Sequence, residues 1–473
     1  MPETFAPWPA LAEIADSVRS GRSSARAQTT EALRRIAFLN SGLNAFVSVD
    51  PDDAMARADA ADARAAAGED LPLAGVPVAI KDNIWVKGRR ITQGSHLFAD
   101  FIAPEDAVAV TRLVAAGAVV VGIANTAEFA AKGQTTNLLH GATRHPLNLA
   151  LTPGGSSGGP VAAVASGMVP FALGTDAGGS SRRPPAHTGL VGFKPSFGAI
   201  PYGPGFEEPF FGISCHCPIA WTVAEAALAF EVMAGPSPLD PHSILIEAEA
   251  APNQRSLRLA FSPKWGLDVP VDPDVAACIA GVADRLSTAG LTIVARDPVW
   301  PAGAAETGLA PLQQAGLASL YGEAWRDKPE RIDPDLGAQI AAGLGYRGTD
   351  VTDALLLSER VAVAASSFFA DGGIDALIGP TTPCTAWPVE KLGPDRIDGV
   401  AVGPRGHAVF TPLFNHSRQP AISVPCGVDT AGLPIGLQIV MPRLKDRSLL
   451  ALAAQIETLL ASPAEVPASS SAA

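Results

Sequence analysis

Charge and cysteine are both scarce in this sequence, and each scarcity narrows the classes of protein that it can encode. Charged residues make up 17% of its 473 residues and the net charge is −13, whereas roughly 25% of an average soluble protein is charged. Because nucleic-acid binding depends on clustered lysine and arginine, we expect no nucleic-acid partner. The five cysteines are an odd number and form no CxxC pair, which argues against a disulfide framework or a zinc cluster. A reducing, cytoplasmic setting fits them best.

Long hydrophobic runs are missing as well. The longest apolar stretch, residues 107–124, contains Arg112 and two glycines and is too short to cross a bilayer. Residues 1–22 have no basic start followed by an apolar core, so we expect no signal peptide. The sequence therefore predicts no membrane partner.

The common metal and nucleotide motifs are also lacking. No HExxH pattern occurs, and the central glycine loops match neither GxxxxGK[ST] nor GxGxxG. In Cys215-His216-Cys217, a strand would put both thiols on one face and the imidazole on the other, so we interpret this segment as a partly buried strand. We expect no metal at this segment, and a nucleotide site has only weak support from the sequence.

Apolar segments at helix and strand spacing are present along most of the chain. Helical spacing marks residues 11–18 and 25–39, and short apolar runs alternate with such segments. This alternation predicts an α/β fold: a single large α/β/α domain with a mostly parallel mixed sheet covered by helices on both faces. The domain is expected over residues 1–461, with N-terminal helices at about 8–67 and a variable helical region at about 240–370, followed by a disordered tail at 462–473. The expected strands are 76–80, 118–123, 171–174, 257–261, 291–295, 376–379, 421–425 and 435–440.

Glycine and serine are concentrated in two central segments, residues 154–159 and 174–181. The first formally matches the GxSxG nucleophile elbow, but Pro153 is awkward at the end of the strand that an elbow requires. In the second, a strand leads into glycines that can aim successive N–H groups at one point beside Ser180. An acyl-transfer oxyanion hole needs this arrangement, although a tight turn with a helix-capping serine would have the same sequence.

A nucleophilic serine needs a base, and two candidates remain open at this point. His187 follows Ser180 closely in the sequence. Lys81 ends the apolar strand 76–80 and could act if burial keeps it neutral, although a lysine at a strand end commonly reaches out to water.

Three ordered segments resemble the amidase signature family. They are Gly75-Val76-Pro77-Val78-Ala79-Ile80-Lys81-Asp82-Asn83, the run 154–159, and Gly174-Thr175-Asp176-Ala177-Gly178-Gly179-Ser180-Ser181-Arg182. Their spacing also fits, and the resemblance runs from about residue 10 to about 460. Departures at Val161, Ser181 and Pro185 bear on substrate class rather than on reaction class.

The resemblance implies a Ser-cis-Ser-Lys triad without metal or cofactor. Ser180 would be the nucleophile, Ser156 the bridging serine after a cis peptide bond, and Lys81 the base. The backbone N–H groups of Ala177, Gly178, Gly179 and Ser180 would form the oxyanion hole. Asp176 and Arg182 are expected to pair inside the fold, and Ser157 to cap the next helix or support the triad.

The function implied is hydrolysis of a carboxamide C–N bond in a linear amide. The alternatives are an amidotransferase-type subunit that delivers ammonia to a partner's tRNA-linked substrate, and a catalytically dead binding protein. The expected partner is a small amide, with a homodimer left open. Tyr202, Phe206, Phe210, Phe211 and Trp387 are candidates for the substrate pocket, which would favour aryl or hydrophobic amides; each could equally be core packing.

Overall fold

The computed structural model describes residues 5–210, 212–247, 257–304 and 308–461. The tail predicted at 462–473 and Phe211 lie outside these residues. The α-helices are α1 (Leu11–Arg19), α2 (Ala25–Leu43), α3 (Pro51–Ala66), α4 (Val108–Ala115), α5 (Gly158–Ala165), α6 (Arg183–Thr188), α7 (Val223–Met233), α8 (Pro273–Thr288), α9 (Ala310–Asp327), α10 (Pro334–Leu344), α11 (Gly348–Gly372), α12 (Leu413–His416) and α13 (Asp446–Ala461). The strands are β1 (Phe46–Val49), β2 (Pro77–Lys81), β3 (Val119–Ala124), β4 (Phe171–Asp176), β5 (Val191–Lys194), β6 (Cys215–Ala220), β7 (Arg258–Phe261), β8 (Thr292–Ala295), β9 (Ala376–Pro380), β10 (Arg396–Ile397), β11 (Val400–Ala401), β12 (Ala421–Val428) and β13 (Pro434–Val440).

One large mixed sheet organises the described chain. Its eleven strands lie in the order β1-β3-β2-β4-β6-β5-β12-β13-β9-β7-β8, and β10 pairs with β11 separately. The α/β class and the mixed sheet are confirmed.

The direction of strand pairing differs from the expected mostly parallel arrangement. Of the ten described pairings in the large sheet, β2 with β3, β2 with β4, β7 with β8 and β7 with β9 are parallel, and the other six are antiparallel. A parallel pair of successive strands needs a crossover, usually a helix. Among the described residues, no helix separates β5 from β6 or β12 from β13, so the centre of the sheet is antiparallel.

Alternating strand residues explain the helical layers on the two faces. On β2, Val78 and Ile80 belong to one apolar cluster and Ala79 to another, as the two-residue period of a strand requires. The first cluster includes α4, α7, α8 and α13, and the second includes α2, α3 and α5. Both faces are therefore covered, which buries a large core.

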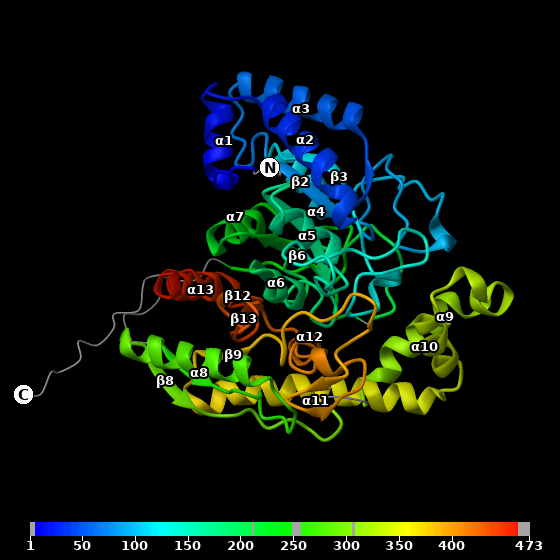
Figure 1. Cartoon of the computed structure of the whole chain (residues 1–473), viewed down its shortest axis with the longest axis vertical. Helices are drawn as coiled ribbons and strands as arrows, with labels where there is room; N and C mark the ends of the chain where they lie inside the picture. The colour runs from blue at the N-terminus through cyan, green and yellow to red at the C-terminus, as the bar shows by residue number, and fades with distance from the viewer. Residues whose placement is uncertain (1–4, 211, 248–256, 305–307, 462–473) are drawn as a thin grey trace, which may run out of the picture.

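The region predicted as helical at 240–370 is helical mainly in its second half. Its second half contains α9, α10 and α11, and its first half contains α8 together with β7 and β8, which match the strands expected at 257–261 and 291–295. Helices α9 and α10 lie to one side of the molecule, away from α1–α3 (Figure 1). Among the described helices, none has both the length and the apolar character that a membrane crossing requires.

Candidate active site

The candidate site lies where two neighbouring parallel strands end. Lys81 is the last residue of β2, and Thr175 and Asp176 are the last two of β4. Ligand sites of α/β sheets form at the carboxyl ends of parallel strands. This edge of the sheet therefore places a lysine, a threonine and a carboxylate together.

Lys81 is completely buried, and hydroxyl oxygens surround its amino group. Its Nζ donates to Ser156 Oγ and to Thr175 Oγ1, each at 2.8 Å. Burial lowers the pKa of Lys81 to about 7, although Asp176, Cys217 and Glu208 act in the opposite direction. A substantial fraction of this lysine is therefore neutral near neutral pH.

The loop that carries Ser156 packs closely against the segment after β3 and is hydrogen-bonded to it. The peptide bond between Gly155 and Ser156 is cis. Thr135 Oγ1 donates to the carbonyl oxygen of Gly154 at 3.0 Å, and the N–H of Gly158 donates to Thr135 Oγ1 at 2.8 Å. A Cβ atom on Gly155 would lie 2.7 Å from the backbone of Gln134, so the close approach of the two segments requires glycine here.

The turn after β4 carries Ser180, which is 6% exposed. Gly179 adopts φ of 113°, a conformation that favours glycine. Its N–H donates to Asp176 Oδ1 at 2.7 Å. In this structure the Asp176 carboxylate engages this N–H, and the expected place of Gly179 in the oxyanion hole stays a prediction. No hydrogen bond is recorded for the N–H groups of Ala177, Gly178 or Ser180 within the described chain.

Asp176 and Arg182 form the expected internal pair, and both are fully buried. The guanidinium donates to both carboxylate oxygens at 3.0 Å, and Asn415 Nδ2 donates to Asp176 Oδ1 at 2.8 Å. Burial alone would raise the pKa of Asp176, but the charge and hydrogen bonds of Arg182 hold it well below its usual range. This pair fixes the turn between β4 and α6.

Two other sequence-based expectations have different outcomes. Ser157 stands at the N-cap of α5 but makes no capping bond there. Its Oγ instead donates to the carbonyl oxygen of Thr175 at 3.2 Å and lies 3.3 Å from Ser181 Oγ, because the hydroxyl faces β4. His187 is 1% exposed, and neither of its ring nitrogens has a partner within the described residues.

The predicted pocket aromatics separate into different surroundings. Phe206 packs with Trp85, Phe98 and Phe101. Tyr202 stacks on His216 with ring centroids 4.5 Å apart and donates its hydroxyl hydrogen to Glu208. Trp387 meets His187 edge to face. The structure therefore does not join these side chains into one recorded cluster.

Phe210 shares a buried cluster with a residue of the serine turn. It belongs to a buried cluster in which Phe129 and Tyr321 stack with centroids 3.8 Å apart. Ala177, from the turn before Ser180, packs against the same cluster. Tyr321 was not identified from the sequence, because α9 reaches this place only through the tertiary fold.

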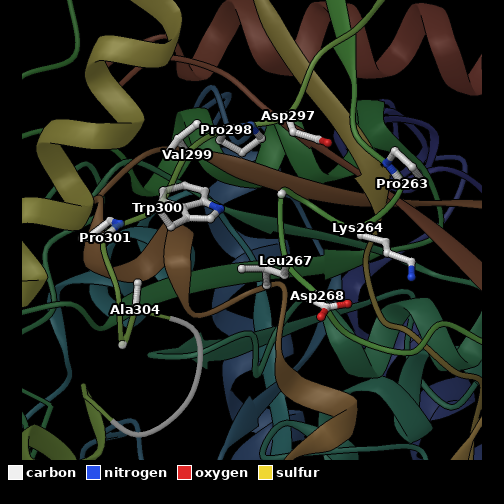
Figure 2. A pocket seen from close by; sticks show the side chains of 12 residues that line it. Pro263, Lys264, Leu267, Asp268, Asp297, Pro298, Val299, Trp300, Pro301 and Ala304 are labelled. Atoms are coloured by element: carbon white, nitrogen blue, oxygen red, sulfur yellow. The ribbon is translucent and has the colours of Figure 1, made fainter.

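A cavity of about 730 Å³ lies elsewhere, at the ends of β7 and β8. Figure 2 shows Lys264, Asp268, Asp297 and Trp300 among its lining side chains. Neither Lys81 nor the two serines line it. The cavity is therefore separate from the candidate active site. No group of three described His, Cys, Asp or Glu residues could hold a metal ion.

Sequence reasoning missed Thr175 and Arg183. Thr175 Oγ1 accepts hydrogen bonds from Lys81 and, at 3.1 Å, from Asn83 Nδ2. Thr175 lies at the end of β4, next to Lys81 at the end of the parallel strand β2. Knowledge of this strand pairing would have identified it from the sequence. Arg183 gives no local signal, since its recorded hydrogen-bond partner is the carbonyl oxygen of Gly155 on another loop.

Comparison with known proteins adds a family and two kinds of relative. A family model described as Amidase matches residues 27–450. The chain is 34% identical to an acylamidase of Rhodococcus erythropolis, over 96% of this chain and 95% of that protein. It is also 34% identical to a glutamyl-tRNA(Gln) amidotransferase subunit of Synechococcus sp. (strain CC9311), over 95% and 96% of the two chains. Among solved structures, a bacterial aryl acylamidase of the amidase signature enzymes superposes with a TM-score of 0.88 at 28% identity, over 96% of each chain.

Proposed function

Because the chain belongs to the amidase signature family, we propose that it hydrolyses the C–N bond of small linear amides through an acyl-enzyme on Ser180. The observation that carries this proposal is the buried Lys81, whose Nζ lies 2.8 Å from Ser156 Oγ and whose pKa is lowered to about 7 by burial. A lysine base requires both features.

In this mechanism, protons move along a relay of three side chains. Neutral Lys81 accepts the proton of Ser156, Ser156 accepts the proton of Ser180, and Ser180 Oγ attacks the amide carbonyl carbon. Thr175 Oγ1 accepts one N–H of Lys81, which leaves the nitrogen lone pair free to face Ser156. The relay then runs backward, protonates the leaving amine as the C–N bond breaks, and water releases the acyl group.

For this step the Ser180 hydroxyl must donate a hydrogen bond to Ser156 Oγ. The Ser180 hydroxyl makes no recorded hydrogen bond within the described residues, and catalytic hydrogen bonds commonly tighten only when substrate is bound. The oxyanion is assigned to the N–H groups of Ala177, Gly178 and Ser180, with Gly179 as the fourth expected donor, whose N–H donates to Asp176 in this structure. Loss of one such donor lowers kcat by about 100- to 1000-fold in a well-studied oxyanion hole.

The test is substitution combined with covalent labelling. A panel of small amides is assayed for released amine or ammonia, with Ser180→Ala and Ser287→Ala compared; Ser287 is exposed near the end of α8. We expect the first variant to lose hydrolysis and fluorophosphonate labelling and the second to keep both. Full hydrolysis of every amide by Ser180→Ala would contradict the proposal.

An amidotransferase role is the second candidate, because the relatives of the two kinds are equally identical to this chain at 34%. In that role the same site would release ammonia for a partner's tRNA-linked substrate. Turnover by the purified chain alone favours the amidase, whereas strict dependence on a co-purifying partner favours the amidotransferase.

The acyl or amine group of the substrate is proposed to meet the aromatic cluster beside Ala177. Phe129, Phe210 and Tyr321 form this cluster, so it could accept a flat or apolar group. The proposed setting is the cytoplasm, with no nucleic-acid contact by the chain itself.

A further inference from the structure

A buried guanidinium without a recorded carboxylate partner lies beside the two serines. Arg183 is 6% exposed. Its Nη2 donates to the carbonyl oxygen of Gly155 over a long 3.5 Å, and its Nε has no partner within the described chain. The carboxylate of Asp176 is paired with Arg182 instead. Buried charges are normally paired or bound to an oppositely charged group, since removing them from water is costly.

The Arg183 guanidinium lies next to both loops that carry the candidate serines. Arg183 Nε lies 3.2 Å from the point where a Cβ atom would stand on Gly179, the residue before Ser180. Gly155, which accepts the hydrogen bond from Nη2, is the residue before Ser156. Because successive Cα atoms are about 3.8 Å apart, a group bound by Arg183 is only a few bonds from a carbonyl attacked by Ser180.

A second unsatisfied donor lies one helical turn further along α6. His187 is on the same face as Arg183 and packs on Gly154, where a Cβ atom would lie 3.0 Å from its Cδ2. Burial lowers the pKa of His187 to about 3, so the ring is neutral and carries one N–H. Neither ring nitrogen has a recorded partner.

The surrounding charges leave this place positive. Burial lowers the pKa of Arg183 to about 9; among its charged neighbours, Arg405 and Arg182 lower it further while Asp176 raises it. The guanidinium therefore stays charged at neutral pH. Asp176 is already matched by the charge of Arg182 and the amide of Asn415.

We propose that Arg183, assisted by His187, binds a carboxylate of the substrate, so that the preferred substrates are small amides with a carboxylate a few bonds from the reacting carbonyl. The guanidinium fork matches a carboxylate with two parallel hydrogen bonds. This inference rests on the proposed amide hydrolysis and names its substrate class.

The first experiment compares acidic amides with neutral counterparts. Succinamate is paired with succinamide, which places the carboxylate on the acyl side, and N-acetylglycine with N-acetylglycinamide, which places it on the amine side. For at least one pair we expect wild-type kcat/KM to favour the acid at least tenfold. Arg183→Met should lower this ratio at least 100-fold and Arg183→Lys less, whereas Arg360→Met, on the exposed surface of α11, should not change it.

An equal ratio in wild type and Arg183→Met, or a tenfold wild-type preference for the neutral member of both pairs, would overturn the inference. If far-UV circular dichroism shows that Arg183→Met does not fold, the wild-type ratio and the Arg183→Lys variant decide the matter.

The second experiment measures binding without catalysis. Titration calorimetry of succinate is performed on Ser180→Ala and on the same protein with Arg183→Met added. We expect the dissociation constant to rise at least tenfold in the double variant. If succinate binding depends on Arg183 but the wild-type chain hydrolyses no amide, the proposed function is refuted and the carboxylate site stands. If the chain hydrolyses amides but neither binds succinate nor prefers acidic amides, water occupies the place beside Arg183. That result would refute the carboxylate site and leave the proposed amide hydrolysis standing.

Discussion

The pH dependence of hydrolysis follows from the environment of Lys81. With a pKa of about 7, the neutral form is about one half of the enzyme at pH 7, about one eleventh at pH 6 and about one hundredth at pH 5. Since only the neutral amine accepts a proton, kcat/KM should fall toward tenfold per pH unit below 7 and level off above 8. The cause of the low pKa is burial, so added salt should move this limb little.

The matching perturbation is Lys81→Arg, which keeps the charge and most of the length but cannot be deprotonated in proteins. We expect a loss of at least about 1000-fold in kcat, because the relay then has no base. Lys87→Arg is the control, since Lys87 is exposed six residues further along the same segment.

The assay is the initial rate at limiting substrate, from pH 5 to pH 9, with an amide that does not itself titrate in that range. A kcat/KM that stays constant from pH 5 to pH 8 would refute a neutral lysine with a pKa near 7. A Lys81→Arg variant that keeps more than a tenth of the activity would refute lysine as the base.

Three further predictions test the surroundings of the site. Thr175→Val removes an oxygen that accepts a hydrogen bond from Lys81. Because the ammonium form of Lys81 loses more stabilisation than the neutral amine, its pKa should fall and the acidic limb of the pH profile of kcat/KM should move below 7. We also expect kcat to fall about tenfold. Arg182→Met leaves the buried Asp176 unpaired and should lower the free energy of unfolding in urea by about 3–5 kcal/mol; a loss under about 1 kcal/mol would contradict the pairing argument. Gly159→Ala would place a Cβ atom 2.3 Å from Asn125 N and should lower the free energy of unfolding by about 1–3 kcal/mol. The control Gly42→Ala has open space around it in α2 and should raise the free energy of unfolding by up to about 1 kcal/mol. Equal effects of the two substitutions in thermal unfolding would refute the close approach at Gly159.

Strand positions were predictable where an apolar run ends at turn residues. The expected strands 76–80, 376–379 and 435–440 match β2, β9 and β13 within one or two residues. The short β1 and β5 were not predicted, since four residues carry little periodic signal. Pairing direction was mispredicted because it depends on connections between distant strands rather than on local composition.

In the candidate site, too, local sequence patterns were predictable and contacts between distant segments were not. Glycine-rich turns and an apolar strand made Ser180 and Lys81 candidates, but the roles of Ser180, Ser156 and Lys81 came from the resemblance to the amidase signature family, and their chemistry remains a prediction. Thr175 was quoted within a motif without a role, because its contact with Lys81 arises only when β2 and β4 pair. Arg183 lacked any signal, since an arginine is ordinarily an exposed residue and its burial depends on the tertiary fold.

The anchoring of Arg182 also sets an order of events during synthesis. Its Nη1 donates to the carbonyl oxygen of Thr411 and to Gln438 Oε1, and the latter residue is 256 positions further along the chain. At about 5–20 residues per second, a ribosome needs roughly 13–50 s to travel this distance. Until then, a nascent chain that already displays Lys81, Ser156 and Ser180 lacks the carbonyl and amide groups that hold the turn before α6. Prematurely terminated chains should therefore be inactive, which separates the appearance of the reactive side chains from the onset of hydrolysis.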